Sequence, residues 1–193
     1  MSNSKVKIKS IKNLSNDWYT LDKVNFDYQI KNGSWQNQNR ESYDRGDGAC
    51  ILLFNAEEKK VILTKQFRMP SYLNGNNDGM MIEVCAGLLD KDDPLTCIKK
   101  EAEEETGYKI SEPKKLFELY STPGAVTEKI HYFIAEYTSA MKISEGGGLE
   151  EESEEIEVLE TDFNKAIEMI STGEICDAKT IVLLQYAQIN KLI

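Results

Sequence analysis

One acidic segment near the middle of the chain constrains its fold most. Asp93 precedes Pro94, and a side-chain acceptor followed by proline is typical of the first turn of a helix. Gly107 is a typical left-handed helix stop. The pattern therefore predicts a helix over residues 94–106. Three of its glutamates share one face, because they stand at positions i, i+3 and i+4: Glu101, Glu104 and Glu105.

This glutamate cluster destabilises the helix unless a cation binds to it. Like charges at these spacings cost about 0.2–0.5 kcal/mol per pair. Each carboxylate in the last turn also meets the negative end of the helix dipole, at a cost of about 0.3–1 kcal/mol. A divalent cation on this face would reverse the sign of these terms, and oxygen ligands favour Mg²⁺, or Mn²⁺, over Zn²⁺. The alternative is a solvated acidic helix end.

The rest of residues 45–193 predicts a mixed sheet with helices on its faces. Helical periodicity recurs over residues 161–172 and 177–191. Short apolar runs predict strands at 49–54, 61–67, 80–87, 115–120, 129–137 and 156–160. A mixed sheet with helices on its faces gives an α/β or α+β sandwich, of which we favour α+β.

Residues 1–44 form a separate part of the chain with a different composition. They alternate polar and apolar residues, contain few large aliphatic residues, and carry an Asn32-Gly33 hairpin turn. Such a segment makes a poor core alone, so we expect a small antiparallel sheet that packs against something else.

The composition excludes several classes of function. The formal net charge of −10 argues against binding to nucleic acid or to an anionic membrane. The N-terminal residues lack an apolar signal segment, and no window approaches 18 apolar residues, so neither export nor membrane insertion is expected. The four cysteines have no C-x-x-C spacing, which favours free thiols in a reducing cytoplasm. His131, the only histidine, is expected to have a packing role.

Residues 87–108 resemble the Nudix box, G-x5-E-x7-R-E-U-x-E-E-x-G-U. The second half matches position by position, with Lys100 where arginine is usual. The first half departs, because the loop after Gly87 is one residue short and Asp92 or Asp93 stands for the first glutamate. Pro123, sixteen residues after Gly107, resembles the nucleoside diphosphate sugar branch. Nearly the whole chain is similar to the bacterial GDP-mannose pyrophosphatases.

This resemblance implies an α/β/α Nudix sandwich, Mg²⁺ as cofactor, and hydrolysis of GDP-mannose to GMP and mannose 1-phosphate. It also implies a homodimer that exchanges its N-terminal sheets, so residues 1–44 would mediate dimerisation, and the cysteine pattern and the lack of a signal segment predict that this homodimer is cytoplasmic. An ADP-ribose or ADP-sugar pyrophosphatase is the alternative within the same class. A non-catalytic Nudix ligand-binding regulator is the alternative from another class, against which the intact glutamate cluster argues.

The resemblance also implies roles for individual residues. The metal site would contain the backbone carbonyl of Ala86 and the carboxylates of Glu101, Glu104, Glu105 and Glu152, with Glu104 in a supporting position. Substrate contacts within one protomer would come from Arg68, Ala86, Gly87, Leu88, Glu105, Glu128 and Lys179. The site of the second protomer would receive Trp18, which replaces the usual tyrosine, Asn39, which replaces a basic residue, and Arg40 and Glu41.

The acidic loop over residues 144–155 is expected to supply the general base. It is two residues longer than is usual in these relatives, so its register is ambiguous. Counting forward from the glycines selects Glu152, and counting back from Ile156 selects Glu154. We favour Glu152, because a residue nearer the glycines has more reach toward an attacking water. Glu105 is the other expected catalytic residue.

Overall fold

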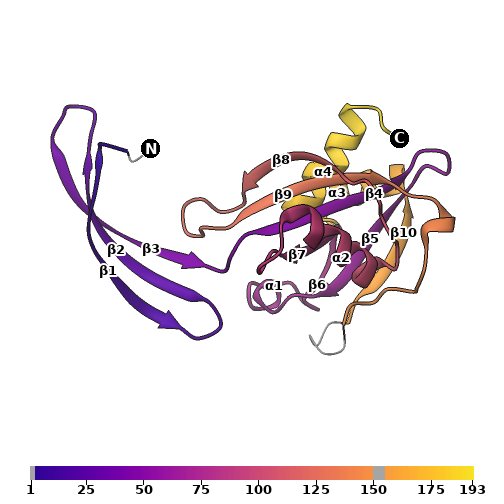
Figure 1. Ribbon diagram of the computed structural model, residues 1–193, viewed down its shortest axis with the longest axis horizontal. Coiled ribbons are helices and arrows are strands. Elements are labelled where there is room, and N and C mark those ends of the chain that lie inside the picture. Colours follow the sequence, from indigo (N-terminus) through magenta and orange to yellow (C-terminus); the bar gives the residue numbers. More distant parts are fainter. Residues whose placement is uncertain (1–2, 150–154) are drawn as a thin grey trace. The chain divides into compact units, whose positions relative to one another are not determined.

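A computed structural model describes residues 3–149 and 155–193, which form two units (Figure 1). The first unit comprises Met1–Asp47 and Tyr120–Lys129. The second comprises Gly48–Leu119 and Ile130–Ile193. The sequence did not indicate that the segment 120–129 would join the first unit.

The first unit is built on a three-stranded antiparallel sheet. Its strands, β1 (Val6–Asn16), β2 (Thr20–Gln29) and β3 (Trp35–Asp44), follow one another in the sheet. The expected hairpin turn lies between β2 and β3, where Gly33 has φ +85° and the Asn32 side chain accepts a hydrogen bond from the Ser34 amide. The segment 120–129 is held at the end of β3, because the Tyr43 amide donates to the Ala125 carbonyl at 2.8 Å.

The second unit contains a seven-stranded mixed sheet in the order β10-β5-β4-β9-β8, with β6 beside β5 and β7 beside β4. Strands β4 and β9 are parallel, whereas β4 is antiparallel to β5 and β7. The strands are β4 (Gly48–Asn55), β5 (Lys60–Phe67), β6 (Met80–Glu83), β7 (Cys85–Leu88), β8 (Lys114–Tyr120), β9 (Lys129–Glu136) and β10 (Glu157–Asp162). The single strand expected over residues 80–87 is two strands, because its halves pair with different neighbours.

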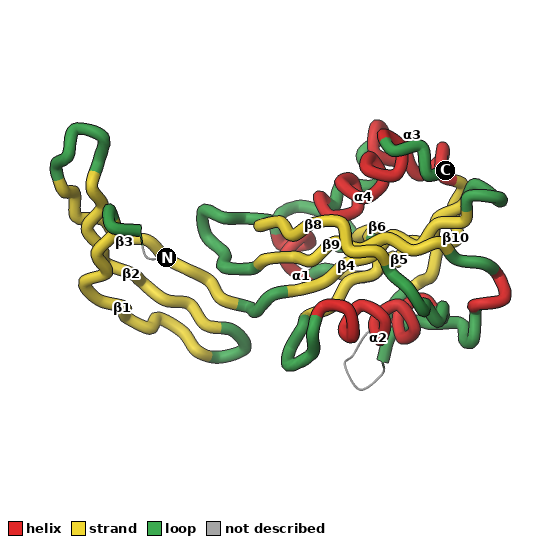
Figure 2. Tube along the Cα trace, turned by 45° about the horizontal axis from the view of Figure 1, so that its top comes forward, coloured by secondary structure: helices red, strands yellow, loops and turns green. Residues whose placement is uncertain are grey.

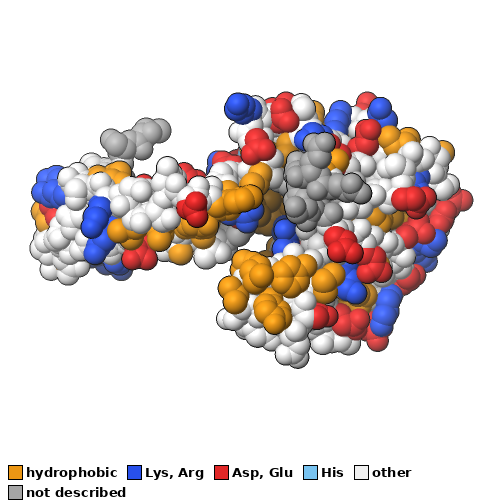
Figure 3. Space-filling view, turned by 90° about the horizontal axis from the view of Figure 1, so that it is seen from below, with side chains coloured by type: hydrophobic (Ala, Val, Ile, Leu, Met, Phe, Trp, Pro, Cys, Tyr) orange, Lys and Arg blue, Asp and Glu red, His pale blue; other side chains and the backbone are white. Residues whose placement is uncertain are grey.

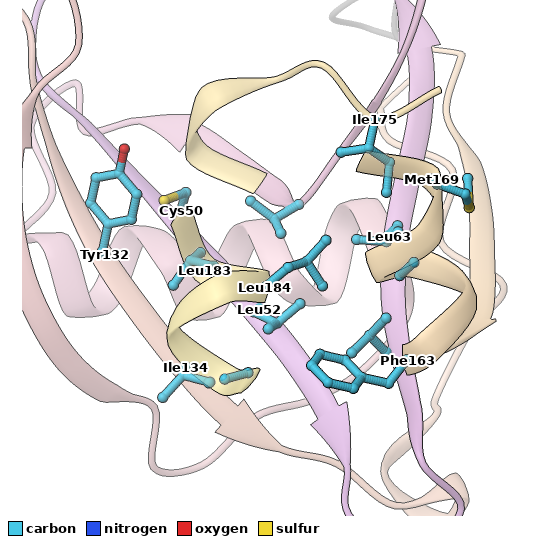
Figure 4. Close-up of a cluster of buried hydrophobic side chains, with 14 of the residues drawn as sticks. Cys50, Leu52, Leu63, Tyr132, Ile134, Phe163, Met169, Ile175, Leu183 and Leu184 are labelled. Carbon is cyan, nitrogen blue, oxygen red and sulfur yellow. The ribbon is translucent and has the colours of Figure 1, made fainter. Parts of the chain in front are cut away.

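Helices cover both faces of this sheet, so the expected α/β/α sandwich is confirmed (Figure 2). Helix α2 (Pro94–Thr106) lies on one face, and α3 (Phe163–Thr172) and α4 (Ala178–Ile189) lie on the other. Alternate residues of β4 face opposite layers: Leu52 packs in the cluster beneath α3 and α4, and Ile51 packs in the cluster beneath α2. Figure 4 shows the first of these clusters.

Capping residues explain where the helices begin and end. The Asp93 side chain accepts hydrogen bonds from the Leu95 and Thr96 amides, and Gly107 has φ +79° at the end of α2, as expected. Helices α3 and α4 begin after the expected starting residues, because Asp162 and Asp177 act as their N-caps. Helix α1 (Met69–Leu73) and the 3-10 turn η1 (Ser139–Met141) were not expected, since both are too short to show a period.

The described helices include none that is both long and apolar enough to cross a membrane.

Candidate functional site

Two glutamates of α2 pack against the backbone of β7. Glu105 is only 1% exposed, and its carboxylate accepts a hydrogen bond from the Ala86 amide at 3.2 Å. The carboxylate of Glu101 lies so close to Gly87 that a Cβ at that position would overlap it. Glycine is therefore required at position 87 for this approach. Strand β7 is itself fixed by pairing with β4, where Gly87 lies opposite Ala49.

These groups fit a hard divalent cation by their chemistry, since carboxylate and carbonyl oxygens are the ligands that Mg²⁺ prefers. Among the described residues, no three histidine, cysteine or carboxylate side chains form a ready-made metal site. A cation held here would therefore combine Glu101 and Glu105 with a backbone oxygen such as that of Ala86.

Glu104 is on the same helix but has a different environment. Its carboxylate lies 3.6 Å from the ammonium of Lys100, one turn earlier. Both residues line a cavity of about 830 Å³ beside α2, together with Lys99, Lys109 and Met141. Lys100 thus keeps an ion pair at the position where the Nudix box has arginine, although an ammonium offers no planar fork.

The glycine-rich loop satisfies the free carbonyls at the end of α2. The Gly147 amide donates to the carbonyl of Glu105 at 2.9 Å, and the Gly148 amide donates to that of Glu104 at 3.2 Å. Gly146, Gly147 and Gly148 all have positive φ, and a Cβ at Gly146 would overlap the Glu105 carbonyl. The start of the acidic loop is thereby attached to the helix that carries the glutamates. Glu152 and Glu154 themselves lie outside the described residues.

A buried ion network surrounds Glu83, three residues before Ala86 in the sequence. Glu83, the last residue of β6, accepts hydrogen bonds from the Nε and Nη2 atoms of Arg68 at 3.1 and 2.9 Å. Its Oε2 atom also accepts one from the Lys179 Nζ at 2.8 Å, and Lys179 donates a further bond to Asp177 at 3.0 Å. The side chain of Glu83 is 4% exposed, and that of Lys179 is 15% exposed.

Burial and ion pairing have opposite effects on the pKa values of Glu83, Lys179 and Arg68. Burial alone would raise the pKa of the Glu83 carboxyl, but Arg68 and Lys179 outweigh burial and hold that pKa at about 2. Burial would lower the pKa of Lys179, but the charges of Glu83 and Asp177 reverse the shift and raise it. Burial likewise opposes the charge on Arg68, and Glu83 with Glu105 raises its pKa.

Sequence reasoning missed Glu83 and Asp177. Glu83 is an isolated charge inside the apolar run over residues 80–87, and Asp177 stands two residues before Lys179. A charged residue in a buried strand is a signal that a partner of opposite charge lies nearby.

All but one of the remaining predicted contact residues belong to the first unit. Trp18 is 85% exposed and packs edge-to-face against Tyr19. Arg40 donates to the Asn39 carbonyl at 2.7 Å, and Glu41 is exposed on the same strand. Glu128 is mostly buried in an ion pair with Arg45 at 3.4 Å. In the second unit, Leu88 ends β7 opposite Gly48.

Comparison with known proteins gives concordant matches over the chain. The family model of the NUDIX domain matches residues 44–181. A model described as the GDP-mannose pyrophosphatase NudK N-terminal domain matches residues 5–43. The chain is 54% identical to proteins named GDP-mannose pyrophosphatase from Escherichia coli O157:H7, Shigella dysenteriae serotype 1 and Shigella flexneri serotype 5b. Each alignment covers 93% of this chain and 93% of the relative.

Proposed function

We propose that this chain, which belongs to the Nudix family of pyrophosphohydrolases, hydrolyses GDP-mannose to GMP and mannose 1-phosphate. The observation that carries the proposal is the arrangement around residues 83–87. The carboxylates of Glu101 and Glu105 pack against β7. In the strand before it, β6, Glu83 forms ion pairs with Arg68 and Lys179. The substrate is taken from the similarity to GDP-mannose pyrophosphatases over 93% of both chains.

Two features of the site would bind a diphosphate. Nudix hydrolases generally use a divalent cation, and we propose that Glu101, Glu105 and the Ala86 carbonyl hold Mg²⁺. When bound, this cation supplies charge that stabilises the phosphate oxygens as the bond breaks. Arg68 and Lys179 bind the diphosphate from the other side. Local positive charge is needed here, because the chain carries a formal net charge of −10 and the substrate is an anion.

The reaction transfers one phosphoryl group to water. A water oxygen attacks one phosphorus while the bond from that phosphorus to the bridging oxygen breaks. A glutamate of the acidic loop, Glu152 in our proposal, takes a proton from the attacking water. The other phosphate leaves with the bridging oxygen. Trp18, Asn39, Arg40 and Glu41 would contact the nucleotide from the second protomer, and Gly87, Leu88 and Glu128 from the first.

A substrate panel tests the activity and the substrate together. With Mg²⁺, we expect GDP-mannose to have the highest kcat/KM and to release GMP, and EDTA to abolish the release. ADP-ribose and ADP-glucose serve as controls, with products measured by chromatography. A higher kcat/KM for an ADP compound would assign the chain to the ADP-sugar enzymes instead. Absence of turnover with every substrate and with both Mg²⁺ and Mn²⁺ would make it a ligand-binding regulator.

We further propose a homodimer that exchanges its N-terminal sheets. Among the described residues, none between 3 and 47 is buried, and hydrophobic side chains lie on the surface of this unit (Figure 3). The exposed members are Val6, Ile8, Ile11, Leu14, Trp18, Tyr28, Trp35 and Tyr43. A three-stranded sheet with so little buried surface needs a cover, and a second copy of the chain would provide it.

Mixing two inactive variants tests the exchange. Arg40→Ala would remove a contact donated to the second protomer, and Glu105→Gln would remove a metal ligand of the protomer's own site. In a random mixture, about a quarter of the sites would combine an unchanged Glu105 from one variant with an unchanged Arg40 from the other, since half the dimers are mixed and each mixed dimer has one complete site. We expect activity to recover to about that fraction after unfolding and refolding the variants together. Recovery that stays at zero, or a monomer in light scattering, would contradict the exchange.

A cytoplasmic location is part of the same proposal. It is supported by four free thiols, three of which are buried in the second unit: Cys50, Cys85 and Cys97.

A further inference from the structure

Glu83 joins the two cations that the proposed function assigns to the diphosphate. Arg68, Glu83 and Lys179 are far apart in the sequence, yet one carboxylate accepts hydrogen bonds from both cations. The bond to Arg68 is bidentate, which fixes the plane of the guanidinium as well as its position. Glu83 therefore controls the orientation of Arg68 and the place of Lys179 at once.

The network leaves part of Arg68 available to a ligand. Its Nε and Nη2 atoms donate to Glu83, whereas no described residue accepts a hydrogen bond from Nη1. The side chain of Arg68 is 40% exposed, although that of Glu83 is only 4% exposed. The carboxylate thus binds the inner edge of the guanidinium, and the Nη1 donors remain for an anion from solvent.

The position of Glu83 is itself fixed from behind. The amide of the next residue, Val84, donates to the Thr180 hydroxyl at 2.8 Å, and that hydroxyl donates to Asp177 at 2.6 Å. Asp177 is the N-cap of α4 and also accepts from Lys179. Three residues after Glu83, the Ala86 amide binds Glu105. An extended chain rises about 3.3 Å per residue, so the cations and the carboxylates are attached to one segment only about 10 Å long.

We propose that Glu83 is a positioning residue that holds Arg68 and Lys179 as one preformed binding pair for the diphosphate of the substrate. This inference rests on the proposed function for its ligand class. Arg and Lys side chains have many rotamers, and ordering them before binding removes that cost from the binding step. The carboxylate also lies between two like charges, whose repulsion it offsets.

Glutamine at position 83 is the direct test. Glu83→Gln keeps the shape of the side chain but removes its charge. It also places an amide N–H donor beside the N–H donors of Arg68 and Lys179. We expect KM for GDP-mannose and the inhibition constant of inorganic pyrophosphate with Mg²⁺ to rise about 10- to 100-fold, because small displacements of binding groups have effects of this size. The concentration of Mg²⁺ that gives half-maximal activity should change little. Glu160→Gln is the matched control, since Glu160 pairs with Lys60 and Tyr137 outside the site.

The pH profile provides a readout that loss of folding would not produce. The Lys179 ammonium faces Glu83 from β6, Asp177 at the start of α4, Arg68 across the carboxylate, and the Cys50 thiol from β4, whose pKa is raised by burial. Without the Glu83 charge, the pKa of Lys179 falls. The alkaline decline of kcat/KM should therefore begin at lower pH in Glu83→Gln than in the wild type.

Glu83→Asp keeps the proposal testable if Glu83→Gln does not fold. Aspartate retains the charge but is one methylene shorter, so we expect wild-type melting and a raised KM. Unchanged KM and pyrophosphate binding in a folded Glu83 variant, or equal losses in Glu160→Gln, would overturn the positioning role. Pyrophosphate is common to every nucleoside diphosphate sugar. Weaker pyrophosphate binding in the variant would support the role of Glu83 even if the substrate panel rejected GDP-mannose.

Discussion

Replacing Glu105 with glutamine is expected to reduce kcat/KM by about 10³-fold or more, since a metal ligand contributes several kcal/mol and each 1.4 kcal/mol is about tenfold in rate. The carboxylate is 1% exposed, and glutamine fits the same space while its carbonyl still accepts from the Ala86 amide. In EDTA, the melting temperature should stay level or rise, because the change removes a negative charge from the last turn of α2.

Glu103→Gln is the control for this variant. It lies on the same helix, but its side chain is 44% exposed and pairs only weakly with Lys109 at 4.0 Å. We expect near wild-type activity from it. Wild-type turnover in Glu105→Gln would refute the metal assignment, and a large drop in its melting temperature in EDTA would refute the account of the helix charges.

The general base gives the second large effect. Glu152→Gln is expected to lower kcat by about 10²–10⁴-fold with little change in substrate affinity, and Glu154→Gln to lower it much less. The Ile156 amide donates to the Gly147 carbonyl at 3.1 Å, so the loop is closed at its base. In the sequence, Glu152 stands near the middle of the segment between Gly147 and Ile156, whereas Glu154 stands close to Ile156. Glu152 is therefore less restrained by the ends of the loop. Steady-state kinetics of both variants decides the register, and the opposite ranking would assign the base to Glu154.

Local signals in the sequence predicted most of the fold. The Asp93-Pro94 start and the Gly107 stop define α2 because capping depends on neighbouring residues alone. The Asn32-Gly33 turn is determined locally in the same way. The short apolar run of β4 indicated a strand, but it could not show that Leu52 and Ile51 would face two different helical layers.

Local signals in the sequence could predict neither the ion network around Glu83 nor the inclusion of residues 120–129 in the first unit. Glu83 and Lys179 are separated by 96 residues, and only the tertiary fold brings them within 2.8 Å. The attachment of residues 120–129 to the end of β3 depends on hydrogen bonds between backbone atoms, which leave no pattern in side-chain type. The resemblance to the GDP-mannose pyrophosphatases predicted Arg68 and Lys179 as separate substrate contacts, whereas the structure connects them through Glu83.

The hydrogen bond between Ile156 and Gly147 has a consequence for how this enzyme can diversify. A loop whose ends are already joined can gain residues without shifting the strand or the helix to which it is attached. Lengthening such a loop from six to eight residues costs only about 0.3 kcal/mol in closure entropy. Insertions here would therefore be almost neutral for folding, and they would change how far the proposed base, Glu152, can extend. Descendants of one scaffold could in this way adapt to leaving groups of different size through a change in loop length alone.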